Sequence, residues 1–177
     1  MRLGRPGIFV LVTVFALTTA VQAATLSARL TFSEYDVHIE ELADGDGVRL
    51  RGAYVSGVEG EPELPVEYVR FVLPPGTTAT GVRTDVLSTV ELEGIFSVRA
   101  RQPEVPLSRP EAATRVARND LVYSLETLYP ARSAVLADVG FMSGSTVATV
   151  AVRPVRYVPA EGRLVLHTAM EIELETT

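Results

Sequence analysis

The clearest alternation of hydrophobic and polar positions lies near the C-terminal end of the chain. Between residues 163 and 175, apolar and polar positions fall on opposite faces: Leu164, Leu166, Met170, Ile172 and Leu174 against Arg163, His167, Glu171, Glu173 and Glu175. A period of two over this length predicts a strand with one face on a core and one in water. Residues 147–158 alternate too, with Ala148, Val150 and Val152 on one face, but their phase changes at Pro154. Because proline has no N–H to donate to a ladder, this change predicts an edge strand or a bulge.

Strand patterns continue through most of the remaining chain. The turn Pro159-Ala160-Glu161-Gly162 joins the two C-terminal strands into a hairpin, and further strands are expected at 26–32, 34–40, 48–54, 67–73, 82–98 (with a break at Gly94) and 133–139. Residues 112–128 are the one helical candidate, where Asn119 or Asp120 can cap a short helix. Short strands between turn signals predict an all-β fold, an antiparallel β-sandwich with at most one short helix.

The N-terminal residues 1–23 have the pattern of a secretory signal peptide. Arg2 and Arg5 precede the apolar run Ile8–Leu17, and Val21-Gln22-Ala23 form a small-residue cleavage site. The run is about half of the ~20 residues that cross a bilayer, which favours cleavage over an uncleaved anchor. We therefore expect export to the periplasm or the extracellular space, a single domain over residues 24–177, and no membrane contact after cleavage.

Composition and charge exclude several classes of function. The chain has 16 basic and 22 acidic residues, for a net charge of −6, and its basic residues are all scattered arginines. Because nucleic-acid phosphates repel an acidic domain, we expect no nucleic-acid partner. The chain has no cysteine, which excludes disulfides, thiolate metal sites and cysteine catalysis. Burial alone must then stabilise the fold, and a domain of about 150 residues is large enough for this.

The usual catalytic and metal-binding residue types have simpler structural interpretations here. His38 and His167 both fall on polar faces of predicted strands, which favours solvated side chains over a catalytic or metal-binding pair. Residues 44–47, Asp-Gly-Asp-Gly, are typical of a hairpin turn. A calcium loop needs Glu at its twelfth position, which is Val55 here.

An acidic strand face is the remaining sign of hydrolytic chemistry. It consists of Glu34, Asp36, Glu40 and Glu41. Paired carboxylates can hydrolyse glycosides, but such a face is more typical of a solvated strand. We therefore expect no metal, no cofactor and no catalytic residue.

The stretch from Val98 to Arg118 is the longest region without strand alternation. It carries five arginines around three prolines: Arg99, Arg101, Arg109, Arg115 and Arg118 with Pro103, Pro106 and Pro110. Two interpretations are open. The stretch is either a surface connector with solubilising charge or a projecting loop that presents an arginine to a partner, since long loops in compact domains often carry function.

Several segments together resemble the propeptide domain of the gingipain-type (C25) cysteine peptidases. The resemblance rests on their order and spacing between about Leu26 and Leu174. The segments are Gly60–Pro65, Val69–Leu73 followed by Pro74-Pro75-Gly76, Leu128-Tyr129-Pro130, Val150–Tyr157, and then Pro159, Gly162 and Leu164.

This resemblance implies a β-sandwich that helps an exported cysteine endopeptidase to fold and inhibits it until the propeptide is cleaved away. The implied partner is the peptidase catalytic domain, in cis or in trans. In arginine-specific members, a prodomain loop arginine occupies the primary specificity pocket, where its guanidinium fork matches a buried carboxylate. The resemblance places such an arginine in the stretch 98–118, with Arg101 and Arg109 as candidates for the inhibitory residue.

The chain departs from a complete peptidase of this family because it has no cysteine and stops at Thr177. We therefore expect no enzymatic activity, from either a free-standing relative of the prodomain or the front fragment of a precursor. The alternative is an exported β-sandwich that binds polysaccharide or an envelope protein, with a hydrolase using carboxylates or histidines as a third class. Exposed aromatic side chains on one sheet face would favour the binding module: Tyr35, Tyr54, Tyr68, Tyr123, Tyr129 and Tyr157 are the ones to locate.

Overall fold

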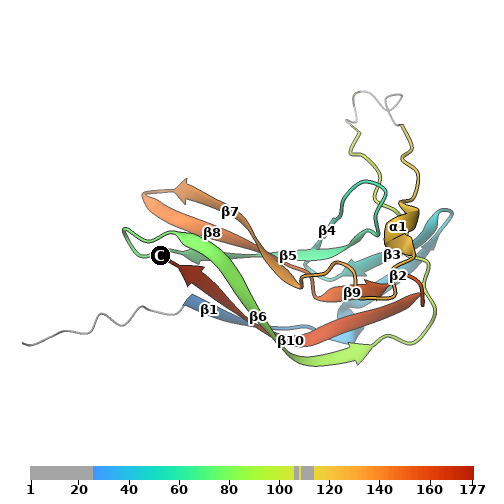
Figure 1. Cartoon of the computed structure of the whole chain (residues 1–177), viewed down its shortest axis with the longest axis horizontal. Coiled ribbons are helices and arrows are strands. Elements are labelled where there is room, and N and C mark those ends of the chain that lie inside the picture. Colours follow the sequence, from blue (N-terminus) through green and yellow to red (C-terminus); the bar gives the residue numbers. More distant parts are fainter. Residues whose placement is uncertain (1–25, 106–107, 109–113) are drawn as a thin grey trace, which may run out of the picture.

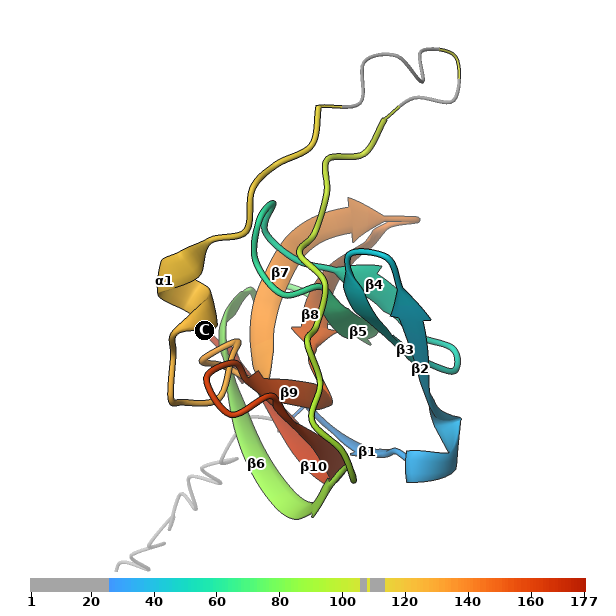
Figure 2. The ribbon, with the colours of Figure 1, turned by 90° about the vertical axis from the view of Figure 1, so that its right-hand side faces the viewer.

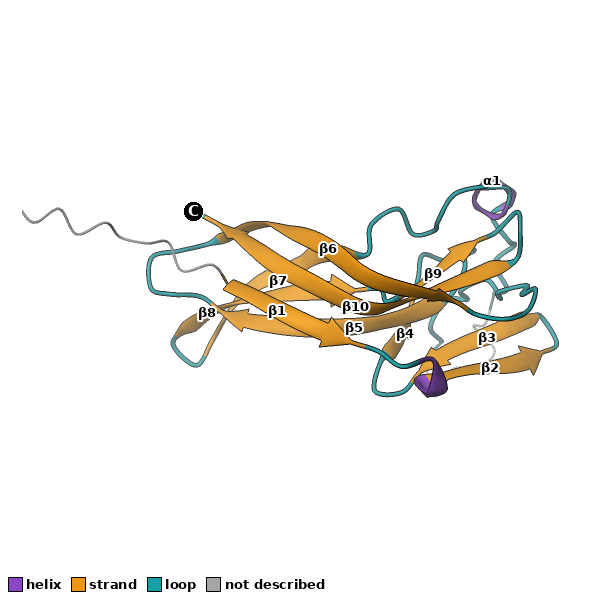
Figure 3. Ribbon diagram, turned by 90° about the horizontal axis from the view of Figure 1, so that it is seen from below, coloured by secondary structure: helices purple, strands orange, loops and turns teal. Residues whose placement is uncertain are grey.

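Two four-stranded antiparallel sheets face each other, and a two-stranded hairpin lies at one end (Figures 1 and 3). The computed structural model describes residues 26–105, 108 and 114–177, so the predicted signal peptide and Arg109 lie outside the described residues. The first sheet contains β1 (Leu26–Thr31), β6 (Ala79–Glu91), β9 (Val155–Val158) and β10 (Arg163–Thr176). The second has the order β4 (Tyr54–Ser56), β5 (Leu64–Val72), β8 (Ser145–Val152) and β7 (Ala134–Met142). The all-β antiparallel prediction is confirmed.

The hairpin and two short helical turns complete the described elements. The hairpin consists of β2 (Val37–Leu42) and β3 (Gly45–Leu50), and the turns are η1 (Glu34–Asp36) and α1 (Asp120–Tyr123). The predicted short helix is thus confirmed, with Asn119 as its cap. No helix within the described residues is long and apolar enough to cross a bilayer.

Strand β10 connects every strand of the first sheet. One of its edges pairs with β6, while the other pairs first with β9 and then with β1. The alternation predicted from the sequence holds in its second half, where Met170 and Ile172 are fully buried and Glu171 is exposed. On the opposite sheet, Val150 and Val152 of β8 are fully buried as well. These side chains form the core between the sheets, and burial of each contributes roughly 1.5–3 kcal/mol.

A second buried cluster lies at the end of the sandwich near the hairpin. Its residues come from both sheets and from the loops around them: Val48, Leu64, Val98, Tyr123, Val155, Tyr157, Leu164 and Leu166. This cluster fixes the position of the long segment between β6 and β7, because Val98 and Tyr123 both belong to that segment and both are buried.

The chain crosses from one sheet to the other at Pro154. Strand β8 ends at Val152 in the second sheet, and β9 begins at Val155 in the first. The N–H of Arg153 donates to the carbonyl of Ser133 at 2.7 Å, and the Pro154 carbonyl accepts from the N–H of His167 at 2.8 Å. The crossing takes the place of the predicted bulge. The predicted edge strand is wrong for β8, which lies between β5 and β7, but holds for β9, whose one partner among the named strands is β10. Proline fits here because its missing N–H falls between two ladders.

The N-terminal half differs from prediction at two places. Residues 34–36 form the 3-10 turn η1, which Ser33 caps, and the strand begins only at Val37. The hairpin turn lies at residues 43–44 instead of 44–47. Gly45 and Asp46 are already part of β3, and the Asp46 carboxylate accepts a hydrogen bond from the Ser97 N–H at 2.5 Å. A Cβ on Gly45, whose φ is 125°, would lie 2.5 Å from the Ser97 carbonyl oxygen. Two residues of the predicted turn therefore contact the distant segment at Ser97 instead.

Truncation of Ile172 to alanine tests the core. We expect Ile172→Ala to lower the free energy of unfolding by about 2–5 kcal/mol, because Ile172 is fully buried and its truncation leaves a cavity. Ile95→Ala is the matched control, because Ile95 is 89% exposed, and it should change stability by less than about 0.5 kcal/mol. Urea unfolding of both variants measures the difference. Equal effects would contradict this assignment of the core.

Candidate functional site: a clamped loop stem

Two chain segments run side by side away from the sheets, at the end where the β2–β3 hairpin and α1 lie (Figures 1 and 2). The outgoing arm is residues 99–105 and the returning arm is residues 114–119; together they are called the stem. Between residues 91 and 120 the described chain forms no named strand or helix. This agrees with the sequence pattern for 98–118, but the strand expected to continue to Val98 already ends at Glu91. Residues 106–107 and 109–113, which join the two arms, lie outside the described residues.

The outgoing arm is held like a short strand between two parts of the body. On one side, the Arg99 N–H donates to the Asp46 carbonyl at 3.0 Å. On the other side, the Arg99 carbonyl accepts from the Glu63 N–H at 3.0 Å, and the Arg101 N–H donates to the Glu61 carbonyl at 2.8 Å. The Arg101 carbonyl accepts from the Gly60 N–H at 2.9 Å. Backbone hydrogen bonds alone thus fix the position of this arm.

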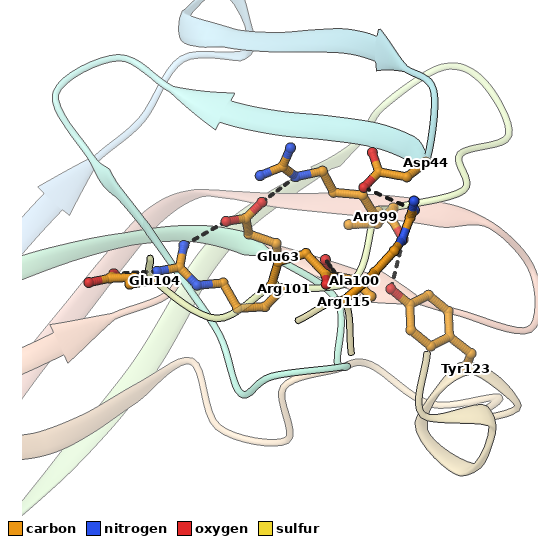
Figure 4. Close-up of polar contacts among 10 residues, drawn as sticks. Asp44, Glu63, Arg99, Ala100, Arg101, Glu104, Arg115 and Tyr123 are labelled. Atoms are coloured by element: carbon orange, nitrogen blue, oxygen red, sulfur yellow. Dashed lines mark hydrogen bonds and ion pairs between the residues drawn. The ribbon is translucent and has the colours of Figure 1, made fainter. Parts of the chain in front are cut away.

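A buried carboxylate reinforces the outgoing arm. Glu63 is only 5% exposed, and its two oxygens accept hydrogen bonds from Arg99 Nε and, at 2.6 Å, from Arg101 Nη1 (Figure 4). Burial alone would raise the pKa of Glu63, but the hydrogen bonds from the two arginines outweigh it and lower the pKa below its usual value. Arg101 also donates a hydrogen bond to Glu104 at 2.5 Å through Nη2. Glu63 is therefore ionised and fully engaged with the arm.

The returning arm is anchored through Gly60 and Gln102. The Asn119 N–H donates to the Gly60 carbonyl at 2.8 Å, so Gly60 bonds both arms. Gly60 has a φ of 82°, and a Cβ there would lie 2.7 Å from the Ala117 carbonyl oxygen. Gln102 connects the arms directly: its Oε1 accepts from the Val116 N–H at 3.0 Å, and its Nε2 donates to the Val116 carbonyl at 3.2 Å.

Two arginines of the returning arm contact the body from outside. The Arg118 guanidinium lies 3.5 Å from the centre of the Tyr123 ring, an attractive cation–π geometry. Tyr123 in turn donates its hydroxyl hydrogen to the Val98 carbonyl at 2.8 Å, and burial raises its pKa. Arg115 lies 3.5 Å from Asp44 in an exposed ion pair that contributes little. A cavity of 330 Å³ between Asp44 and the arms is lined by both arginines.

The structure separates the residues that the sequence singled out. Arg101 lies in the stem, where Glu63 and Glu104 occupy both ends of its guanidinium. Arg109 lies outside the described residues. The acidic residues Glu40 and Glu41 are exposed on β2, as expected for a solvated strand. Among the described residues, no group of three metal-binding side chains comes together.

The tyrosines do not gather on one face. Tyr123 and Tyr157 are buried, Tyr129 is half-buried, and Tyr35 lies on η1. Tyr54 and Tyr68 are exposed neighbours on paired strands, with ring centres 5.9 Å apart. Their planes are inclined by 54°. Because sugar rings stack on flat aromatic surfaces, this pair does not form the platform that the polysaccharide-binding alternative needs.

His38 is exposed as predicted, but His167 is buried, which corrects the sequence interpretation. His167 directly follows the residues of β10 that pair with β9, and its Nδ1 has no hydrogen-bond partner. Arg156 of β9 is buried too, and it donates to Ser133 Oγ at 2.8 Å and the Leu128 carbonyl at 3.1 Å. Burial first and the Arg156 charge second lower the pKa of His167 to about 4. The imidazole is therefore neutral at physiological pH.

Glu63 and Gln102 are the functional residues that sequence reasoning missed. Glu63 was part of the segment Gly60–Pro65 that carried the family resemblance, so its place between two prolines was the available signal. Gln102 had no such signal, because its partner Val116 lies 14 residues away in a stretch without periodicity.

Comparisons with family models and with solved structures place the chain among known proteins. The family model Propeptide_C25 matches residues 16–177. The fold is similar to a structure that addresses the zymogenic latency of gingipain K from Porphyromonas gingivalis, with a TM-score of 0.68 and 20% identity over 88% of this chain and 89% of that chain. It is also similar to the complex of Porphyromonas gingivalis RgpB pro- and mature domains, with a TM-score of 0.65 and 15% identity over 90% of this chain and 82% of that chain. No curated protein sequence matches the chain.

Acidification should lower the free energy of unfolding because of the buried His167. Because the pKa of His167 is lower in the folded chain (about 4) than its usual 6.5, the unfolded chain binds more protons between these values. Stability due to neutral His167 is present above about pH 6.5 and is lost as pH falls toward about 4, by roughly 2–3 kcal/mol. Chemical unfolding at about pH 7.5 and pH 4.5 measures this loss.

Two variants separate this effect from carboxylate protonation. His167→Gln should lose less stability on acidification than the unchanged chain, whereas His38→Gln, at an exposed position, should lose as much as the unchanged chain. If His167→Gln keeps the full acid sensitivity, the neutral buried imidazole is not the cause.

Proposed function

The chain belongs to the Propeptide_C25 family, and we propose that it acts as folding chaperone and inhibitor of an exported cysteine peptidase catalytic domain, in cis or in trans. A propeptide domain is non-catalytic. The solved relatives concern gingipain K latency and a complex of pro- and mature domains, which supports a catalytic domain as the partner. Export through the signal pattern in residues 1–23, to the periplasm or the extracellular space, is part of this proposal.

The proposed inhibitory role rests on one observation, the geometry of the stem. It holds two arms away from the sheets and leads from Gln102 to Val116 by a chain that includes Arg109. A segment whose ends are fixed loses less conformational entropy on binding, so it binds more tightly. The remainder of the domain supplies the scaffold that anchors those ends.

Between the two candidate arginines, the contacts favour Arg109 as the residue that enters the specificity pocket. Arg101 could reach a peptidase only by leaving Glu63 and Glu104. The buried Glu63 carboxylate would then lose one of its two cationic partners, which is strongly unfavourable. We therefore assign Arg101 to the stem and Arg109 to the peptidase.

Alanine substitution of the two arginines tests this assignment. Arg109→Ala should weaken inhibition of an arginine-directed C25 peptidase by at least about 30-fold, because a desolvated guanidinium–carboxylate pair contributes about 2 kcal/mol or more. The stability of the domain should not change. Arg115→Ala, an exposed arginine of the same stem, is the control and should inhibit like the unchanged chain within about threefold. Inhibition constants from substrate turnover measure all three.

Other outcomes of this experiment are equally informative. If Arg109→Ala inhibits normally and Arg101→Ala loses inhibition without losing stability, the specificity role belongs to Arg101. If the unchanged chain does not inhibit such a peptidase at micromolar concentration, the proposed function is wrong.

The residue after Arg109 protects the bound segment from cleavage by the peptidase. Pro110 makes the bond after Arg109 a tertiary amide with no N–H. The ring also restricts the residue before it, so the Arg109–Pro110 bond is a poor substrate for a peptidase that cuts after arginine.

Replacement of Pro110 should allow the peptidase to cut the chain after Arg109. On incubation with the peptidase, Pro110→Gly should be cut after Arg109, whereas the unchanged chain and the control Pro103→Gly should remain intact there. Mass spectrometry of the products over time locates the cut. Equal cleavage of all three after Arg109 would show that proline does not protect this bond.

A further inference from the structure

The two arms of the stem are anchored to the body independently of each other. The outgoing arm is held by the backbone bonds of Arg99 and Arg101 and by the carboxylate of Glu63. The returning arm is held by the bond from Asn119 to Gly60 and by Arg118 over Tyr123. None of these contacts depends on residues 106–113.

Gln102 adds a direct connection between the arms. Its amide bonds both the N–H and the carbonyl of Val116, as a neighbouring strand would, and Nε2 also lies 3.3 Å from the Ala100 carbonyl. The side chain is partly buried, so water competes only partly for these groups. Gln102 is thus the residue whose side chain bonds both arms within the described part of the stem.

A cut between the arms would leave all of these contacts in place. Hydrolysis of one peptide bond there consumes one water molecule and leaves a carboxylate on the outgoing piece and an amine on the returning piece. Each new end would remain attached to its own arm. Because the body holds both arms, the second piece stays at a high effective concentration near the first.

We propose that Glu63 and Gln102 are positioning residues that keep the stem closed without a continuous chain between its arms, so that cleavage there does not release the peptidase. This inference rests on the proposed inhibitory function. Hydrolysis of a peptide bond between the arms then does not end latency. Activation requires removal or unfolding of the whole domain.

A domain that can be cut on demand tests this proposal. A recognition sequence for TEV protease, Glu-Asn-Leu-Tyr-Phe-Gln-Gly, is inserted between Pro110 and Glu111, which keeps both Arg109 and Pro110. After the cut, we expect both fragments to elute together in native size-exclusion chromatography and to separate only in denaturant. The inhibition constant of the cut domain should be within about tenfold of the value for the same domain uncut.

Substitutions in the stem separate a positioning role from a merely structural one. A positioning role predicts a larger loss of inhibition in the cut domain than in the uncut domain. In the uncut domain, Gln102→Ala should weaken inhibition by no more than about fivefold. In the cut domain, the same substitution should weaken inhibition by a further tenfold or more. The two arms are then joined neither by a continuous chain nor by the Gln102 amide. Glu63→Gln should behave in the same way, since it removes the charge and keeps the shape.

Matched controls come from outside the stem. Thr77→Ala removes a polar contact of 2.7 Å with the Pro74 carbonyl, and Asp36→Asn removes the charge of an exposed ion pair with Arg51. Both should leave the ratio of cut to uncut inhibition unchanged.

Each result decides between the two proposals. If the uncut domain does not inhibit, the proposed function fails. If the uncut domain inhibits but the cut fragments separate or lose more than a hundredfold in inhibition, the clamped stem is wrong and the inhibitory function stands. If Gln102→Ala and Glu63→Gln leave the cut domain as good an inhibitor as before, these two residues do not position the arms.

Discussion

The pairing of β10 with three other strands is the constraint from which the sandwich is built. One edge of β10 carries β6, and the other edge is shared between β9 and β1. The two halves of this strand therefore have different surroundings. The half beside β1 has one buried and one solvated face, whereas the half beside β9 is buried on both. The crossing at Pro154 makes this possible, because it brings β9 into the first sheet immediately after β8 has left the second.

The stem depends on a different kind of interaction, the desolvated charge of Glu63. A buried carboxylate is costly unless hydrogen bonds and opposite charges satisfy it, and here Arg99 and Arg101 do both. Apolar side chains could stabilise the same junction, but they would not set the direction of the arm. The fork of each guanidinium accepts few geometries, so the pair orients the chain as well as attaching it. The proposed entry of the segment into a peptidase pocket would need this precision.

Local patterns in the sequence predicted the features that depend on local physics. The alternation of β10, the short helix with Asn119 as its cap, and the long stretch without strands between 98 and 118 all follow from neighbours along the chain. The burial of His167 did not follow, because it depends on β9 and Arg156, which reach it through the crossing at Pro154. The role of Glu63 was equally hidden. Its partners lie 36 and 38 residues away, and no periodic pattern relates such positions.

The direction of β10 has a consequence for how a second domain could be connected. The strand starts near the stem, where the Gly162 carbonyl accepts from the Phe96 N–H, and runs to the opposite end of the sandwich, where Thr177 lies (Figure 1). Its 14 residues span about 46 Å at roughly 3.3 Å per residue. A catalytic domain attached after Thr177 and bound at the stem would either lie along the whole flank of the sandwich or use a connection of about 14 extended residues. A separate polypeptide has no such restriction. The reach of that connection therefore distinguishes inhibition within one chain from inhibition between two.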